Sequence, residues 1–325
     1  MDVDPHLHDP DRWGTSMAQM AELMLGCLDA VGARSVMEVG AFAGDLTRVL
    51  VEWAAGSGAR VIAIDPAPQD ALTQLAGERP ELELVRETSL EALTRLPAPD
   101  AMVIDGDHNY YTVAEELKRV ADRARESRFP LVLLHDVCWP HGRRDDYFDI
   151  EQIPEEFRHP QAGANGGIAP EDPGLVEGGL PYPRSAAHEG GPRNGVRTAA
   201  EDFVAGHDGL QLAVVPLFFG FGAIWDREAP WAEAVAAILA PWDRNPVLER
   251  LEANRVHHLA TGHARLTEIW ALRQRVADQE RVLRRLTESS AFGVAERLSR
   301  LRVRAGVAPS HSVVSKEEIR RVLDD

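Results

Sequence analysis

Short apolar segments alternate with amphipathic segments along the first two thirds of the chain. Residues 15–31 carry methionine and leucine at three- and four-residue spacing, which predicts a helix that ends near Gly32. Apolar runs predict five strands, over residues 34–40, 59–66, 82–88, 100–106 and 130–137. Helical spacing between them predicts helices from Asp45, over 69–76, up to Arg95 and over 111–125. This alternation predicts an α/β fold whose parallel sheet is covered by helices on both faces.

The pattern changes after the fifth predicted strand. Residues 139–194 are rich in Gly, Pro, Asp, Glu and His without sustained periodicity, which predicts an irregular lid or substrate-binding insert. A helix over 196–205 and two strand-like runs, LQLAVVPL and FGFGAIWD, follow. Because these two runs are joined tightly through residues 218–220, they must pair as an antiparallel hairpin. We therefore expect a Rossmann-like, seven-stranded, mostly parallel sheet with an antiparallel C-terminal hairpin, over residues 1–226.

The remaining residues, 227–325, predict a charged helical extension. Leu259, Leu266, Ile269, Val276 and Leu283 approximate a heptad, but the charged Arg273 and Glu280 occupy seam positions, so the coiled-coil signal is weak. Residues 241–325 also carry more Arg and Lys than Asp and Glu, although the whole chain is acidic. We expect an element for assembly, with homo-oligomers forming through these helices; the alternative is a helical cap on the first domain.

Composition narrows the classes of partner and compartment. A formal net charge of −17 and a pI near 5.2 oppose attraction to phosphate backbones, so no nucleic-acid partner is expected. Cys27 and Cys138 lie far apart without CxxC spacing, which fits a reducing cytoplasm. The acidic start and the short longest apolar stretch, residues 210–225, predict neither a signal peptide nor a membrane helix.

One turn has the composition of a cofactor site. In EVGAFAG, Glu38 stands near the end of the first strand, and Gly40 and Gly44 frame the turn into the next helix. Glycines allow a sharp turn and close approach of a ligand, while a carboxylate can hold an ammonium group. The next strand ends at Asp65, where a carboxylate can bind both ribose hydroxyls. A dinucleotide fingerprint would need glycine at Phe42. Two carboxylates and no phosphate-binding turn suit a ligand that has an ammonium group and a ribose but no phosphate. S-adenosylmethionine (SAM) is such a ligand.

These segments carry a resemblance to a known family. MEVGAFAG resembles motif I of class I SAM-dependent methyltransferases, VIAIDP resembles their second motif, and the terminal hairpin is similar to that of their sheet; the resemblance covers residues 14–226. It implies that Asp65 binds the ribose and that Glu87, Thr88 or Ser89 lies near the adenine. The segment IDGDHNYYTVAEEL, residues 104–117, is similar to a subgroup with Asp105 beside the methionine portion and His108 facing the active site, and this subgroup tolerates Phe42. The expected cofactor-binding set is Glu38, Gly40, Ala41, Gly44, Asp65, Pro66, Glu87, Ser89, Asp105 and Gly106.

Candidate catalytic residues lie at the same ends of the strands. Methyl transfer needs alignment of nucleophile and methyl group, and a base when the nucleophile is a hydroxyl. His108, His135 and Asp136 are the candidates, and the alternative for each histidine is a hydrogen-bonded structural role. Asp105 and Asp136 could instead hold Mg²⁺, an arrangement that resembles metal-dependent O-methyltransferases, including those that act on sugars.

The insert and the extension offer weaker candidates. His257 and His258, in the extension, have no acidic neighbours in the sequence and are expected at the surface. Side chains of the insert could line an acceptor pocket, or belong to a solvated loop: Tyr147, Phe148, Tyr182, Arg184, His188 and Arg193.

The sequence thus favours a cytoplasmic methyltransferase acting on a hydroxyl of a small molecule. A sugar of a natural product or surface glycan is the preferred acceptor, because the segment ESSAFGVAERLSRLR resembles helical segments of bacterial glycan-assembly enzymes. A catalytically silent SAM-fold scaffold is the first alternative. A nucleotide-dependent oxidoreductase is the second, and the acidic turn without GxGxxG disfavours it.

Overall fold

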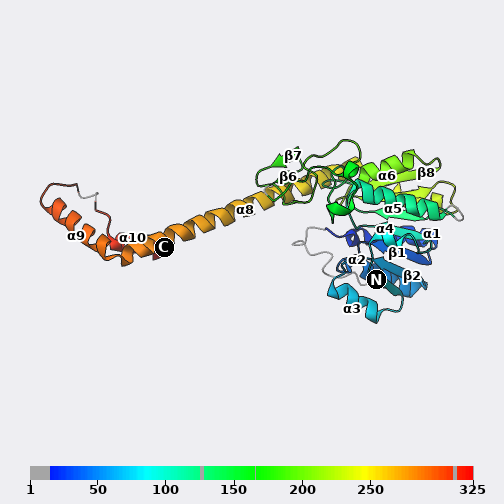
Figure 1. Ribbon diagram of the computed structural model, residues 1–325, viewed down its shortest axis with the longest axis horizontal. Coiled ribbons are helices and arrows are strands. Elements are labelled where there is room, and N and C mark those ends of the chain that lie inside the picture. Colours follow the sequence, from blue (N-terminus) through cyan, green and yellow to red (C-terminus); the bar gives the residue numbers. More distant parts are fainter. Residues whose placement is uncertain (1–14, 125–127, 165, 310–312, 325) are drawn as a thin grey trace. The chain divides into compact units, whose positions relative to one another are not determined.

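A mixed sheet of seven strands forms the core of the first part of the chain (Figure 1). The computed structural model describes residues 15–124, 128–164, 166–309 and 313–324. The strand order is β3-β2-β1-β4-β5-β9-β8; β1 to β5 are parallel, and β9 runs antiparallel to both β5 and β8. This confirms the predicted sheet and its terminal hairpin. The strands are β1 Ser35–Val39, β2 Arg60–Ile64, β3 Leu82–Val85, β4 Ala101–Ile104, β5 Leu131–Leu134, β8 Leu210–Val215 and β9 Phe221–Asp226.

Helices connect the strands where the periodicity predicts them. The helix α1 ends at Gly32, whose φ of 67° gives the left-handed C-cap that glycine favours. The helix predicted over residues 111–125 corresponds to α5, and Arg125 lies outside the described residues, as does the acidic start of the chain. The helices of this part are α1 Ala21–Val31, α2 Asp45–Ser57, α3 Asp70–Glu78, α4 Ser89–Ala92, α5 Tyr110–Arg123, α6 Val196–Ala205 and α7 Ala232–Leu239.

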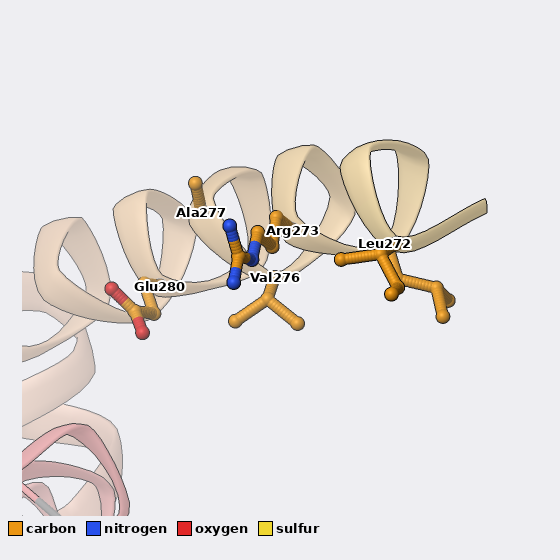
Figure 2. Close-up of a pocket in the computed structure, with 6 residues that line it drawn as sticks. Leu272, Arg273, Val276, Ala277 and Glu280 are labelled. Carbon is orange, nitrogen blue, oxygen red and sulfur yellow. The ribbon is translucent and has the colours of Figure 1, made fainter. Parts of the chain in front are cut away.

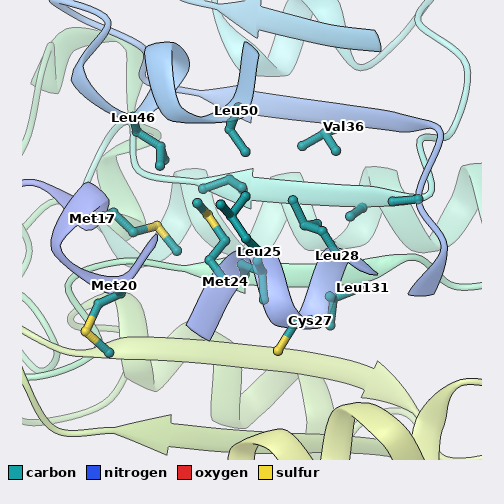
Figure 3. Close-up of a cluster of buried hydrophobic side chains, with 14 of the residues drawn as sticks. Met17, Met20, Met24, Leu25, Cys27, Leu28, Val36, Leu46, Leu50 and Leu131 are labelled. Atoms are coloured by element: carbon teal, nitrogen blue, oxygen red, sulfur yellow. The ribbon is translucent and has the colours of Figure 1, made fainter. Parts of the chain in front are cut away.

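Each face of the sheet has its own apolar core. One core joins the strands to α1, α2 and α7, and Figure 3 shows Leu28 of α1 and Leu50 of α2 in the same cluster as Val36 of β1 and Leu131 of β5. The other joins the opposite face to α4, α5 and α6, through residues such as Met102. Because β1 to β5 are parallel, their carboxyl ends meet at one edge of the sheet, where loops can hold polar groups.

The segment after β5 is folded, which corrects the prediction of an irregular stretch. It contains a two-stranded antiparallel sheet, β6 Gly167–Ala169 and β7 Asp172–Val176, with short 3₁₀ turns before it. Arg144 is fully buried and donates to the carbonyls of Ala186 and Pro173 at 2.6 and 2.9 Å. Polar residues therefore organise this insert from inside, and a hydrophobic periodicity cannot report such a framework.

The C-terminal part is helical, as predicted. It consists of α7, α8 Pro246–Glu288, α9 Ser290–Arg304 and α10 Lys316–Asp324. The chain divides into two compact units between Thr261 and Gly262, so α7 and the first turns of α8 belong to the first unit. Within the described residues, no helix is both long enough and apolar enough to cross a membrane.

Candidate active site

The loops after β1 and β4 touch at Gly40. Gly40 has a φ of 84°, and a Cβ there would lie 2.1 Å from the carbonyl oxygen of Asp105 and 2.4 Å from Cα of Gly106. Only glycine permits both this left-handed backbone and this contact. Gly44 has a φ of 87° and is the N-cap residue of α2, while Ala41 between them is buried. The predicted turn is therefore a close-packed backbone surface at the end of the sheet.

Glu38 lies beneath this turn as a buried carboxyl group. Its side chain is 2% exposed, and Oε2 has no hydrogen-bond partner among the described residues. Burial, together with the nearby Asp105 and Asp65, outweighs the lowering effect of Thr47 and raises the pKa of Glu38 to about 8. A buried carboxyl with an unused oxygen fits a cationic group such as the ammonium of SAM.

We expect Glu38→Gln to stabilise the ligand-free protein at pH 8 while weakening its binding of S-adenosylhomocysteine (SAH), the demethylated cofactor. The folded-state pKa is raised, so the stability that Glu38 contributes is complete below pH 4.5 and is lost as the pH rises to about 8. Glutamine stays neutral, so we expect a gain of about 1–2 kcal/mol, a few degrees in Tm, at pH 8 and little gain at pH 5.

Thermal unfolding at both pH values and calorimetric titration with SAH measure the two effects. Glu52→Gln, on the exposed side of α2, is the matched control and should change neither quantity. A variant that loses stability at pH 8 would contradict the assignment of Glu38 as an uncompensated buried carboxyl.

Asp65 joins the first two loops of the site. Its Oδ2 accepts a hydrogen bond from the backbone N–H of Phe42 at 2.7 Å, and its Oδ1 accepts one from Ala67 at 2.7 Å. Each carboxylate oxygen retains a lone pair, so both could still accept bonds from ribose hydroxyls. Pro66 follows as an exposed residue. Asp65 therefore has a structural role in addition to the predicted binding role.

The residues expected near adenine lie at the start of α4. The side chain of Thr88 caps this helix in a capping box with Glu91, and Ser89, the first helical residue, is buried. Glu87 forms an exposed ion pair with Arg95, at 2.7 Å. Ser89 therefore faces the protein interior, whereas Glu87 faces solvent.

His135 is held by acceptors on both ring nitrogens. Nε2 lies 2.9 Å from the carbonyl oxygen of Phe218, and Nδ1 lies 3.1 Å from Oδ1 of Asp105 and 3.3 Å from Oδ2 of Asp136. A carbonyl only accepts, so Nε2 carries a proton, and the two carboxylates favour a proton on Nδ1. Burial lowers the pKa of His135, but both carboxylates outweigh it and raise the pKa well above 6.5. This geometry argues against His135 as a base.

The same geometry bears on the Mg²⁺ hypothesis. Asp105, His135 and Asp136 each offer a ligand atom within 4.8 Å of the others. Mg²⁺ prefers oxygen ligands in an octahedron, but here an imidazolium already lies between the two carboxylates and compensates their charge. The donor set therefore does not fit Mg²⁺, and no catalytic step is assigned to a metal ion.

His108 approaches the same carboxylates from the loop between β4 and α5. Its Nε2 lies 3.4 Å from Oδ1 of Asp105 and 3.2 Å from Oδ2 of Asp136, without the alignment of a hydrogen bond. Burial lowers the pKa of His108, but Asp136 and Asp105 outweigh burial and raise it to about 9. The side chain is 26% exposed, so an acceptor molecule can reach the ring. Asp136 adopts a φ of 56°, an uncommon value outside glycine that directs its carboxylate to this place.

A second polar group, which the sequence did not predict, lies beside His108. The ring of His141 stacks on that of His108 with centroids 5.2 Å apart, and it makes a T-shaped contact with the ring of Tyr182. Burial lowers the pKa of His141 to about 4, and its Nδ1 has no hydrogen-bond partner among the described residues. Asp146 joins His108 and His141 in a cluster. His141 and Asp146 belong to the segment HGRRDD, which falls within the predicted insert. So many polar residues so soon after a buried strand could have indicated that this segment belongs to the site.

Two residues of α8, which the sequence did not single out, help to hold His135 in place. The carboxylate of Glu252 accepts hydrogen bonds from the N–H groups of Phe218 and Phe219 at 3.2 and 2.8 Å. Arg255 pairs with Glu252 at 2.7 Å and lies over the Phe219 ring at 4.4 Å. Because Phe218 supplies the carbonyl that holds His135, the first turns of α8 fix the orientation of this histidine.

The other candidate residues of the insert and the extension differ in their burial and contacts. Tyr147 is fully buried and donates to Asp145, so it is part of the insert's framework. Phe148 is 55% exposed. Arg193 lies over the ring of Phe157. His257 is exposed, as expected, but it contacts the carboxylate of Glu171 from the insert, an acidic partner that the sequence did not indicate.

Comparisons with known proteins agree with the architecture. Residues 37–137 match the model of a family described as a methyltransferase domain. No curated protein matches the chain.

The solved structures that match the chain are remote in sequence. An SAH-bound methyltransferase from Podospora anserina is 15% identical, with 69% of this chain and 84% of that chain covered and a TM-score of 0.42. A putative O-methyltransferase from Klebsiella pneumoniae is 18% identical, with 69% and 90% covered and a TM-score of 0.39. A putative caffeoyl-CoA O-methyltransferase from Staphylococcus aureus is 13% identical, with 64% and 83% covered and a TM-score of 0.39.

The family match spans β1 to the end of β5, the segment that holds Glu38, Gly40, Asp65, Asp105 and His108. The sheet has the predicted order and hairpin. The protein therefore contains a class I SAM-dependent methyltransferase domain.

Proposed function

We propose that this protein transfers the methyl group of SAM to a hydroxyl of a small molecule, with His108 as the base. The observation that carries the proposal is the position of His108 at the carboxyl end of β4, where Asp136 and Asp105 approach its Nε2 at 3.2 and 3.4 Å. A carboxylate on one ring nitrogen leaves the other nitrogen to take the proton of a substrate. The Glu38–Gly40 turn lies at the end of the adjacent strand β1.

Each residue has a separate task in this proposal. When bound, SAM supplies an electrophilic methyl group on its sulfonium. Glu38 binds the ammonium and Asp65 the ribose, which aligns the methyl group with the acceptor oxygen. Asp136 and Asp105 hold His108 through its Nε2, so that Nδ1 removes the hydroxyl proton as the oxygen attacks. His135 remains an imidazolium that keeps both carboxylates in place.

A polyhydroxylated acceptor, a sugar of a natural product or glycan, suits the groups beside His108. Tyr182 offers an aromatic face to ring C–H groups, while His141 and Asp146 offer polar atoms for neighbouring hydroxyls. In this proposal residues 1–226 form the catalytic domain, and the folded insert, residues 139–194, covers the acceptor. The net charge of −17 disfavours an acidic macromolecule such as a nucleic acid.

An activity assay tests the proposal. Purified protein is incubated with SAM and matched panels of sugars, phenols, amines and thiols, and products are identified by mass spectrometry and NMR. We expect methylation at oxygen, unchanged by EDTA because His135 supplies the compensating cation. Methylation at nitrogen or sulfur would contradict the proposal. SAH binding without any transfer would favour a silent scaffold, and a preference for NAD would favour an oxidoreductase.

The pH dependence of the reaction gives a second test. His108 must be neutral to accept a proton, and its pKa of about 9 results from Asp136 and Asp105, opposed by burial and by His135. The neutral fraction therefore falls about tenfold per pH unit below 9. We expect kcat/KM for the acceptor to rise from pH 6 to 9 and then level off, while SAH affinity is measured at each pH as a control. A profile that levels off near pH 6.5 would contradict the assigned role of the carboxylates.

A further inference from the structure

The second unit exposes an apolar helix face. Between Gly262 and Val276, the helix α8 carries large apolar side chains that are more than two fifths exposed: Leu266, Ile269, Trp270, Leu272 and Val276. Ile269, Leu272, Arg273, Val276, Ala277 and Glu280 line a shallow concavity along one side of the helix. Figure 2 shows Arg273 between Leu272 and Val276, with Glu280 further along the same helix. A contiguous apolar face of this kind indicates an interaction surface.

The spacing of this face identifies its centre line. Positions 266, 269, 273, 276, 280 and 283 alternate steps of three and four, the seam of a two-stranded coiled coil. Four of the six positions are Leu, Ile or Val, and the other two are Arg273 and Glu280. Charges in a seam are costly unless they meet opposite charges, so these two residues restrict how a partner helix can be placed.

A parallel pairing of two copies brings identical residues together. In a parallel seam each position faces its own counterpart, so Arg273 would meet Arg273 and Glu280 would meet Glu280. Both layers would place like charges in contact within an apolar interface. The sequence of this face therefore disfavours the parallel arrangement.

An antiparallel pairing removes this conflict. A two-fold axis between residues 274 and 275 places Leu266 opposite Leu283 of the second copy, Ile269 opposite Glu280, and Arg273 opposite Val276. Arg273 then lies four residues, about 6 Å along the axis, from Glu280 of the second copy. A guanidinium group can bridge this separation, so the two seam charges of one copy pair with those of the other. Trp270 also meets the small Ala277, which leaves room for its ring.

We propose that two copies of this chain associate through residues 266–283 of α8 as an antiparallel two-stranded coiled coil. The exposed apolar side chains would bury on the order of 500 Å² per copy, and ~1,000 Å² in total reaches the lower range of specific interfaces. The charged seam residues determine orientation, as buried polar residues do in other coiled coils. This inference does not depend on which acceptor the enzyme methylates.

Cysteine cross-linking of the full-length protein tests the orientation. Variants Leu266→Cys and Leu283→Cys are prepared separately and mixed under mild oxidation, with wild-type protein as the background for the native Cys27 and Cys138. The antiparallel pairing predicts a disulfide dimer only in the mixture, because positions 266 and 283 face each other. Dimers formed by either variant alone would show the parallel pairing and overturn the proposal.

Sedimentation equilibrium tests whether these charges hold the pair together. We expect wild-type protein to be dimeric at tens of micromolar, and Arg273→Glu to weaken association at least tenfold, because it places two carboxylates in contact. The double variant R273E/E280R should restore association, and Gln274→Glu, off the seam, should leave it unchanged. Circular dichroism confirms that each variant is helical. A monomeric wild type, or a double variant no tighter than R273E, would overturn the proposal.

Discussion

Replacing His108 by glutamine is expected to lower kcat about 10²–10⁴-fold without changing the affinity for SAH by more than about twofold. The reason is the placement of its ring: Nε2 faces Asp136 and Asp105, and the side chain remains 26% exposed. Glutamine keeps hydrogen-bonding atoms near the carboxylates but cannot accept a proton. Steady-state kinetics with the acceptor from the activity assay, together with SAH calorimetry, measure the two quantities.

A histidine of the same chain provides the control. His258 is exposed on α8, and His258→Gln should leave both quantities unchanged. Loss of SAH binding in His108→Gln would assign His108 to the cofactor instead of the acceptor. Full activity of His108→Gln would remove it from the mechanism and make His141, the neutral neighbour in the cluster, the next candidate base.

The second large effect is expected from Gly40→Ala. A methyl group there would lie 2.1 Å from the Asp105 carbonyl oxygen, and the φ of 84° adds backbone strain of about 1–2 kcal/mol. Relief requires the loops after β1 and β4 to separate; the first loop follows Glu38 directly, and the second carries Asp105. We expect a loss of about 3 kcal/mol or more in stability, several degrees in Tm, and at least 100-fold weaker SAH binding.

Gly56 provides the matched substitution. It lies near the end of α2, has no positive φ, and has no atom within 4 Å of the place that an added methyl group would take. Gly56→Ala should therefore keep SAH affinity and stabilise the protein by up to about 1 kcal/mol. If Gly40→Ala behaved like Gly56→Ala, the close contact between the two loops would not be a requirement of the site.

The fold was predictable because its strands and helices differ in hydrophobic period. The run VIAIDP is short, apolar and rich in β-branched residues, and it forms β2; the residues from Asp45 show helical spacing and form α2. The hairpin of β8 and β9 followed from its tight connection. In the insert, by contrast, buried Arg144 and Asp145 organise the chain through hydrogen bonds to distant carbonyl and N–H groups. Such contacts depend on tertiary structure and leave no period in the sequence.

The location of the candidate site was predictable because its polar residues come at or just after the ends of strands. Glu38, Asp65, Asp105, His108 and Asp136 were all expected at one edge of the sheet because parallel strands end there. Their individual roles could not be predicted, because the protonation of a histidine depends on atoms from remote segments. His135, a candidate base by sequence, has its second nitrogen bound by the carbonyl of Phe218, 83 residues away in the chain.

The contacts that these residues make with Glu252 and His141 could not be predicted from the sequence either. Glu252 braces the Phe218 loop from α8, in a region where the sequence indicated only a charged helix. His141 lies against His108 because the chain folds back after β5. Both contacts join segments that have no regular spacing between them.

Calorimetric titration of the purified protein with SAH tests the central claim most directly. The account predicts micromolar binding to wild type and at least tenfold weaker binding, about 1.4 kcal/mol, to Asp65→Ala, whose carboxylate is placed for the ribose. Asp70→Ala, at the exposed start of α3, serves as the control and should bind as wild type does. Absence of SAH binding to folded wild-type protein would contradict the account, and with it the assignment of Glu38 and Asp65 to a cofactor.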